Sequence, residues 1–259
     1  MTSCFGWSVY PGPAHRMRIE TYATRLVLPG DNLLSLIDDR LPELRERTVL
    51  VVTSKIVSLC EGSYVKPEEG FSKEDLVKRE ADSYWEGGEG CDIRLTIKNG
   101  RLLPSAGIDE SNGGGLFVLH PEDAFRSARL VWEHIRRRGG LWEAGVLITD
   151  SNVVPMRRGV VGVGLGWCGF DPLRRYVGRP DCFGVPLRRT AGNNVDALAA
   201  AAVFCMGEGG EQTPLAVIDG IRDLPFRHLP PTPEEIRESA VSVREDLYAP
   251  LLMNPDVSP

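Results

Sequence analysis

The amino-acid sequence predicts an α+β fold in which mixed sheets are flanked by helices. Short runs rich in Val, Ile and Leu alternate along the chain with longer stretches of helical periodicity. No internal repeat or low-complexity tract interrupts this alternation. The chain has 259 residues, of which 42% are hydrophobic, so it can bury a substantial core without disulfides or a structural metal. We therefore expect an irregular lead over residues 1–17, one main domain over residues 18–225, and a C-terminal helix and tail over residues 226–259.

Four segments rich in β-branched residues predict the strands of the core. They are residues 49–57, 146–150, 160–167 and 214–221. In the third segment, Gly162, Gly164 and Gly166 alternate with apolar residues. This spacing does not match the phosphate-binding GxGxxG turn, and it favours close packing of another backbone against the strand.

Helices are predicted from apolar periodicity and from end signals. Three of them cover residues 29–41, 121–138 and 193–206, and the last two are followed by Gly139 and Gly207. A C-terminal helix should begin at the Thr232-Pro233-Glu234-Glu235 capping sequence. Residues 62–92 are polar and punctuated by glycine, so we expect a surface excursion made of a helix and a loop.

Composition argues against several classes of protein. The six cysteines form no CxxC pair, which disfavours a zinc site or a disulfide framework. The net charge is −6, and the longest basic run is the Arg136-Arg137-Arg138 triplet at an expected helix end, so nucleic-acid binding has little support. No segment reaches the roughly 20 apolar residues of a membrane span, and the N-terminus lacks a secretory pattern. We therefore expect a cytoplasmic protein.

Polar side chains at two places are candidates for a cation and phosphate site. Asp109, Ser111 and Asn112 lie in a GIDESNGGG segment, where oxygen ligands suit Mg²⁺ or Mn²⁺ and glycine amides suit phosphate. A solvated Asx turn is the alternative, and these residues alone favour it. Asp150 ends a predicted strand and precedes Ser151, at the kind of edge where open sheets bind ligands. A simple turn cap is the alternative there.

Two further segments could join the site. Lys55 lies in the predicted strand 49–57, where a lysine must reach the surface or neutralise an anion, and the two alternatives are equally supported. Residues 206–213 form a glycine-rich loop after a helix, and Glu208 in this loop could complete a metal shell. Taken alone, that loop would be a connector.

The ordered set of segments resembles the coenzyme F-420-0:γ-glutamyl ligase family over roughly residues 20–221. The segments are VVTSKIVSLCEG, SAGIDESN, VLITDS followed by PMRRG, GRPDCFGVPLR, and NNVDALAAAAVFCMGEG. The resemblance implies a mixed α/β architecture, residues 18–225 as the γ-glutamyl ligase-like domain, and an intertwined homodimer. It also implies a reaction in which GTP, or ATP, phosphorylates an acceptor carboxylate and the amine of L-glutamate displaces the phosphate. Two divalent cations, Mg²⁺ or Mn²⁺, would assist.

The resemblance also implies roles for individual residues. Those matching metal ligands are Asp109, Asp150, Ser151 and Glu208. Those matching nucleotide contacts are Ser54, Lys55, Asn112, Met206, Gly207, Gly209, Gly210 and Thr213. The expected catalytic residues are Asp109, Asp150 and Lys55, because cations and a lysine can spread the charge of a transferring phosphoryl group. The four histidines lie in no motif, and we expect no catalytic histidine.

Departures from the family pattern leave the acceptor open between a folate and coenzyme F-420-0. Residues 23–25 replace a Gly-(Leu or Ile)-Pro loop, Leu59 replaces a lysine, and residues 152–159 differ from the usual segment. These departures favour a branch associated with folate glutamylation, so we expect glutamate addition to a reduced folate. Two alternatives are an amide ligase for another amino acid and acceptor, and a non-catalytic nucleotide-binding homologue. Retention of Asp109, Asp150 and Glu208 argues against the latter.

Overall fold

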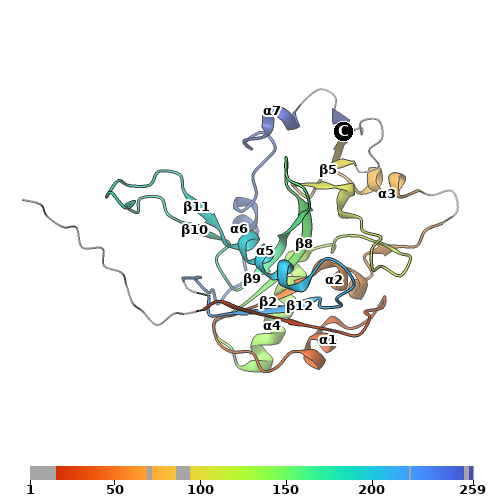
Figure 1. Ribbon diagram of the computed structural model, residues 1–259, viewed down its shortest axis with the longest axis horizontal. Coiled ribbons are helices and arrows are strands. Elements are labelled where there is room, and N and C mark those ends of the chain that lie inside the picture. Colours follow the sequence, from red (N-terminus) through yellow and green to blue (C-terminus); the bar gives the residue numbers. More distant parts are fainter. Residues whose placement is uncertain (1–15, 69–71, 86–93, 222, 254–256, 259) are drawn as a thin grey trace, which may run out of the picture.

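The computed structural model describes residues 16–68, 72–85, 94–221, 223–253 and 257–258. Its centre is a five-stranded sheet of order β1-β12-β2-β8-β9 (Figure 1). The strands are β1 (Arg18–Tyr22), β12 (Leu215–Asp219), β2 (Thr48–Thr53), β8 (Ala144–Val153) and β9 (Val160–Cys168). Within this sheet β2 and β8 run parallel and the other neighbours run antiparallel. The predicted mixed sheet is therefore confirmed.

Helices cover both faces of this sheet, because successive side chains of a strand point to opposite faces. Val49 and Val51 pack with α5 (Asn194–Met206) on one face. Leu50 and Val52 face the opposite side, which is covered by α1 (Leu33–Arg40), α2 (Ser54–Glu61) and α4 (Ala124–Gly139). The arrangement is the α+β fold with flanking helices that the sequence predicts. None of the helices in the described part of the chain combines the length and apolar composition of a membrane span.

The alternating glycines of β9 allow both helical layers to approach the strand closely. A Cβ on Gly164 would lie 2.1 Å from Val195 Cγ1 in α5, and one on Gly166 would lie 2.5 Å from the carbonyl carbon of Ala124 in α4. The two glycines face different helices because the register of β8 and β9 shifts between Ile148 and Thr149. The close-packing interpretation of these glycines is confirmed.

Smaller sheets surround the central one. A four-stranded sheet has the order β13-β4-β5-β6, with β13 (Val257–Ser258), β4 (Ser83–Trp85), β5 (Leu95–Lys98) and β6 (Arg101–Pro104). Two-stranded sheets join β3 (Tyr64–Val65) to β7 (Phe117–Val118) and β10 (Leu173–Arg175) to β11 (Ala191–Asn193). The β10–β11 pair carries its connecting segment away from the body of the molecule (Figure 1).

The predicted surface excursion over residues 62–92 contains β3, α3 (Lys73–Glu80) and β4. Residues 69–71 and 86–92 of this segment lie outside the described residues, as do residues 1–15 of the predicted N-terminal lead. The C-terminal helix α6 (Pro233–Glu238) begins as predicted, with Thr232 and Glu235 forming a capping box. A short helix, α7 (Ala249–Leu252), follows it.

Two predicted strand boundaries are wrong. The strand expected over residues 49–57 ends at Thr53, and Ser54 begins α2. This helix ends before Gly62, whose φ is 89°. Ile56 and Val57 are β-branched, but burial of both in the core on one side of α2 outweighs their preference for strands. The strand expected to end at Asp150 continues to residue 153, so Asp150 lies within β8. The helices predicted over residues 29–41, 121–138 and 193–206 are confirmed in slightly different bounds.

Candidate active site

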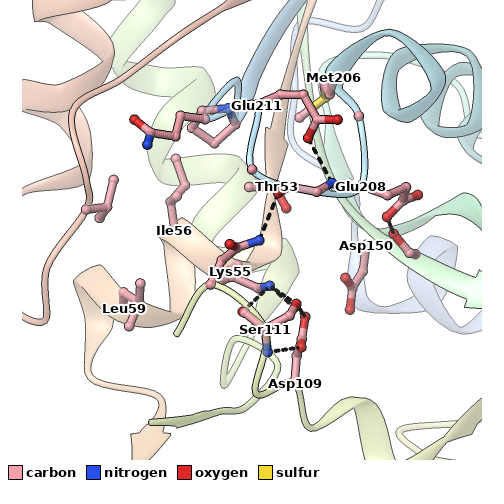
Figure 2. A pocket seen from close by; sticks show the side chains of 18 of the residues that line it. Thr53, Lys55, Ile56, Leu59, Asp109, Ser111, Asp150, Met206, Glu208 and Glu211 are labelled. Carbon is pink, nitrogen blue, oxygen red and sulfur yellow. Dashed lines mark hydrogen bonds and ion pairs between the residues drawn. The ribbon is translucent and has the colours of Figure 1, made fainter. Parts of the chain in front are cut away.

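A cavity of about 720 Å³ lies beside the carboxyl end of β2 (Figure 2). Its walls come from segments that are distant in the sequence, within residues 24–27, 53–59, 104–114, 150–151 and 203–214, together with Lys73 and Val160. The predicted site residues that line it are Lys55, Asp109, Asn112, Asp150, Ser151, Met206, Gly207, Glu208, Gly209, Gly210 and Thr213. Ser54 differs, because its side chain is buried and does not line the cavity.

Lys55 lies in the first turn of α2, and not in a strand as the sequence suggested. Its Nζ contacts Asp109 Oδ2 at 2.6 Å and donates to the Ser111 carbonyl oxygen at 2.7 Å and to Ser111 Oγ at 3.0 Å. Figure 2 shows these three side chains turned toward one another. The alternative of a solvated, snorkelling lysine is therefore wrong, since Lys55 neutralises a carboxylate inside the cavity.

Asp109 sits at the start of the turn that the sequence suggested. Its Oδ1 accepts from the Ser111 backbone N–H at 2.7 Å, which is an Asx turn, and its Oδ2 faces Lys55. The turn and the cavity site thus coexist in one segment. Burial acts to raise the pKa of Asp109, but the Lys55 ammonium and the Ser111 donors outweigh burial and hold this pKa below its ordinary value. Asp109 is consequently ionised at neutral pH.

A left-handed turn aims Asp109 at the cavity. Ser105, Ala106 and Gly107 have φ values of 49°, 52° and 72°. For the two residues that are not glycine, this region costs energy and persists only where the surroundings enforce it. The buried Thr96 hydroxyl does so, because it donates to the Leu103 carbonyl at 2.6 Å and accepts from the Ala106 N–H at 2.8 Å.

Asp150 and Ser151 reach the cavity from the half of β8 that emerges from the core. Ser151 Oγ donates to Glu208 Oε2 at 2.6 Å, so β8 and the loop after α5 meet here. Asp150 Oδ2 lies 2.7 Å from Nε2 of His120, a residue to which the sequence assigned no role. No motif around His120 could have identified it, and the residue reaches this place because it follows the short strand β7, whose Val118 pairs with Asp109.

The loop after α5 is held by its own side chains. Gly207 ends the helix with a φ of 84°, and Glu211 Oε2 accepts from the Gly209 N–H at 2.8 Å. Asn112 Nδ2 donates to the Gly209 carbonyl at 2.9 Å and ties this loop to the Asp109 segment. Glu211 is a second residue of the site that the sequence did not single out.

The donor chemistry of the cavity fits a divalent cation. Asp109, Asp150 and Glu208 supply the carboxylate oxygens that Mg²⁺ and Mn²⁺ prefer. In the described ranges of the chain, no three His, Cys, Asp or Glu side chains converge into a ready-made metal cluster. Each of these carboxylates instead has a protein partner, which is Lys55, His120 or Ser151 respectively.

Residues at two of the family departures also line the cavity. Thr24, Arg25 and Leu59 form part of the wall together with Ile56. Arg25 is held by Asp31, with Nη1 to Oδ2 at 2.6 Å, so the segment that carries it is braced. The residues that differ from the family pattern, Thr24, Arg25 and Leu59, therefore alter the surface that a ligand in the cavity would contact.

Comparison of the sequence with known proteins identifies the family of this chain. The sequence model of the family described as F420-0:Gamma-glutamyl ligase matches residues 22–220. A coenzyme F420:L-glutamate ligase from Methanopyrus kandleri is 35% identical over 216 residues, which cover 76% of this chain and 84% of the relative. The enzyme of the same name from Archaeoglobus fulgidus is 32% identical, covering 79% of this chain and 89% of the relative. The enzyme of the same name from Haloarcula marismortui is 34% identical, covering 77% of this chain and 84% of the relative. The chain therefore belongs to the F420-0:γ-glutamyl ligase family and is a ligase that forms a γ-glutamyl amide bond.

Proposed function

We propose that this chain is a nucleotide- and divalent-cation-dependent γ-glutamyl ligase that joins L-glutamate to a carboxylate of coenzyme F420-0. The observation that carries the proposal is the meeting of three carboxylates, one lysine and a glycine-rich loop around a single cavity. The names of the relatives support the acceptor, since each of the three is a coenzyme F420:L-glutamate ligase.

The proposed reaction has two steps. An oxygen of the acceptor carboxylate attacks the γ-phosphorus of GTP or ATP, which gives an acyl phosphate and a nucleoside diphosphate. The amine nitrogen of glutamate then attacks the acyl carbon and forms the amide. The bond between the acyl carbon and the phosphate oxygen breaks, and inorganic phosphate and a proton leave.

The residues of the cavity have distinct roles in this proposal. Asp109, Asp150, Ser151 and Glu208 would hold Mg²⁺ or Mn²⁺, which when bound spreads the charge of the transferring phosphoryl group. Lys55 adds a fixed positive charge beside Asp109. The amides of the loop 207–210 offer donors to phosphate oxygens, as glycine-rich turns do in other nucleotide sites.

The apolar part of the wall has a separate role. Val27, Ile56 and Leu59 line the cavity, and Ile56 and Leu59 are buried. An acyl phosphate is hydrolysed by water that reaches it, so a wall of this kind protects the intermediate. The wall also gives the flat rings of a nucleotide base or a deazaflavin an apolar surface to contact.

A reduced folate is the second candidate acceptor. It is favoured by the position of Thr24, Arg25 and Leu59 on the cavity wall, because exchanges there alter ligand contacts and leave the carboxylates in place. A folate already ends in a glutamyl carboxylate, so the same phosphoryl transfer could activate it without new catalytic groups.

The proposal includes a homodimer. The segment between β10 and β11 exposes apolar side chains far from the core, with Val177, Phe183 and Val185 exposed by 61%, 88% and 57%. Apolar side chains grouped on a projecting segment are typical of a surface that a partner covers. Sedimentation equilibrium of the full chain is the direct test, and a concentration-independent monomer would contradict it.

A product assay tests the function. Purified protein would be incubated with Mg²⁺ or Mn²⁺, GTP or ATP, L-glutamate, and either coenzyme F420-0 or tetrahydrofolate, and the products analysed by mass spectrometry. We expect a deazaflavin heavier by one glutamyl residue. A folate product without a deazaflavin product would reassign the acceptor. Nucleotide hydrolysis without either product would support a different amide ligase, and absence of nucleotide turnover would support the non-catalytic homologue.

A further inference from the structure

His120 lies between the two segments that carry Asp109 and Asp150. Its side chain is 11% exposed, and its Nε2 is 2.7 Å from Asp150 Oδ2. An ionised carboxylate only accepts hydrogen bonds, so the hydrogen belongs to Nε2. The contact occupies one oxygen of Asp150 and leaves Oδ1 available to another partner.

The same imidazole packs against the left-handed turn that precedes Asp109. A Cβ on Gly107 would lie 2.3 Å from His120 Nε2, so the ring occupies space that any other residue at position 107 would fill. Gly107 is therefore required for two reasons, its φ of 72° and the room it leaves for the ring.

The backbone that leads into His120 is anchored. Val118, two residues earlier, exchanges both backbone hydrogen bonds with Asp109, at 2.9 and 2.8 Å. The Leu119 N–H donates to the Ser63 carbonyl at 3.0 Å. Because His120 follows directly, its ring position is set by the same strand pairing that sets Asp109.

We propose that His120 is a positioning residue that fixes the Asp150 carboxylate relative to Asp109, and so prepares both for one divalent-cation site. The terminal torsion of an aspartate is soft, so a carboxylate without a partner samples a broad range of orientations. A hydrogen bond from a ring held by Gly107 and the Val118 pairing removes that freedom. This inference rests on the proposed function, because it takes Asp150 as a cation ligand.

The test is a titration of the full chain with Mn²⁺ in the absence of nucleotide and acceptor. The electron paramagnetic resonance signal of free Mn²⁺ measures how much of the ion is bound. His120→Leu keeps the bulk and removes the donor, and loss of such an outer partner weakens metal binding by about 10-fold to 100-fold. His120→Gln places an amide N–H near the position of Nε2 and should restore most of the affinity. His120→Asn is too short to reach Asp150 and should behave as His120→Leu does.

A second histidine pair in the same chain is the control. His134 Nε2 lies 2.8 Å from Asp38 Oδ1, and its side chain is 17% exposed, but the pair joins α4 to α1 outside the cavity. His134→Leu should leave Mn²⁺ affinity unchanged. Thermal unfolding of each variant separates loss of the fold from loss of the site, and His120→Asn serves if His120→Leu does not fold.

The Asp150→Asn background separates the inference from the function on which it rests. If His120 acts through Asp150, His120→Leu costs no further affinity once Asp150 is changed. Wild-type Mn²⁺ affinity in folded His120→Leu, with weakened binding in Asp150→Asn, would overturn the inference and leave the metal site standing. Unchanged binding in Asp150→Asn would instead remove Asp150 from the site and overturn both.

Discussion

Lys55 and Asp109 form a direct ion pair inside the cavity, with Nζ 2.6 Å from Oδ2, although 53 residues separate them in the sequence. The side chain of Lys55 is 20% exposed and that of Asp109 is 43% exposed, so ligands can reach the carboxylate. Because Lys55 also donates to Ser111, its charge is committed to the Asp109 segment. A phosphate or a cation that enters the cavity must therefore exchange contacts with this pair.

We expect Lys55→Ala to weaken nucleotide binding. Hydrogen bonds that involve a charged group contribute about 1.5–3 kcal/mol, so the dissociation constant should rise roughly 10-fold to 100-fold. Isothermal titration with GTP and with ATP measures the change. Lys98→Ala is a matched control. Lys98 Nζ lies 2.8 Å from Glu80 Oε2, and neither residue lines the cavity. Unchanged affinity in Lys55→Ala would mean that Lys55 only neutralises Asp109.

Asp109→Asn should lower turnover by at least ~10²-fold while the fold remains intact. The substitution removes negative charge from the proposed cation site. It removes nothing from the core, since the Asp109 side chain is nearly half exposed. Steady-state release of phosphate in the presence of acceptor and glutamate measures turnover, and circular dichroism checks the fold. Turnover close to that of wild type would exclude Asp109 from the reaction.

The Arg25–Asp31 pair should make stability depend on acidity in a defined window. The Arg25 side chain and the Leu28 N–H lower the pKa of Asp31 from 3.8 to about 2. A carboxyl group whose pKa is lowered by folding stabilises the protein at pH values above its ordinary pKa. That contribution is lost as the pH falls from 3.8 toward about 2. Asp31→Asn should thus be less stable than wild type at neutral pH, and the free energies of unfolding of the two proteins should converge as the pH falls through this window. Urea unfolding at successive pH values tests this, and a constant difference would contradict the assignment.

Thr96→Val should destabilise the protein by about 1–3 kcal/mol, because it leaves the Ala106 N–H without its acceptor in the core. Thr96→Ser retains the hydroxyl and is the matched control. Urea unfolding of both variants gives the free energies. If the left-handed turn depends on Thr96, turnover should fall in Thr96→Val as well, since Asp109 follows that turn. Equal stability of the Val and Ser variants would refute the role of the hydroxyl.

Local patterns were enough to predict the elements whose signals agree with one another. The Val-, Ile- and Leu-rich runs of β8 and β12 and the capped helices α4, α5 and α6 were predicted because propensity, periodicity and end residues all indicate the same structure. The helix α2 was predicted as a strand because Ile56 and Val57 carry strand propensity, and only their burial in three dimensions reverses it.

The site was predictable to a similar degree. Residues in the family motifs were identified, and all of them except Ser54 line one cavity. The contact of His120 was not identified, because this residue stands in no recognisable motif. Glu211 lies in the loop 206–213 that the sequence indicated, but its contact with Gly209 was not predicted. His120 meets Asp150 across 30 residues of sequence, and no local spacing indicates a contact of that kind.

The parallel pairing of β2 and β8 has a consequence for changes in chain length. Thr53 is opposite Thr149 in this pairing, directly before the turn into α2 and directly before Asp150. Deleting one residue between positions 149 and 151 would turn the following side chains to the other face of the sheet. The segment between β10 and β11 projects from the body, and the pairing of these two strands is separate from the central sheet. Changes of loop length there should leave the register of the central sheet intact, whereas an insertion or deletion next to Thr149 should misplace Asp150 and Ser151.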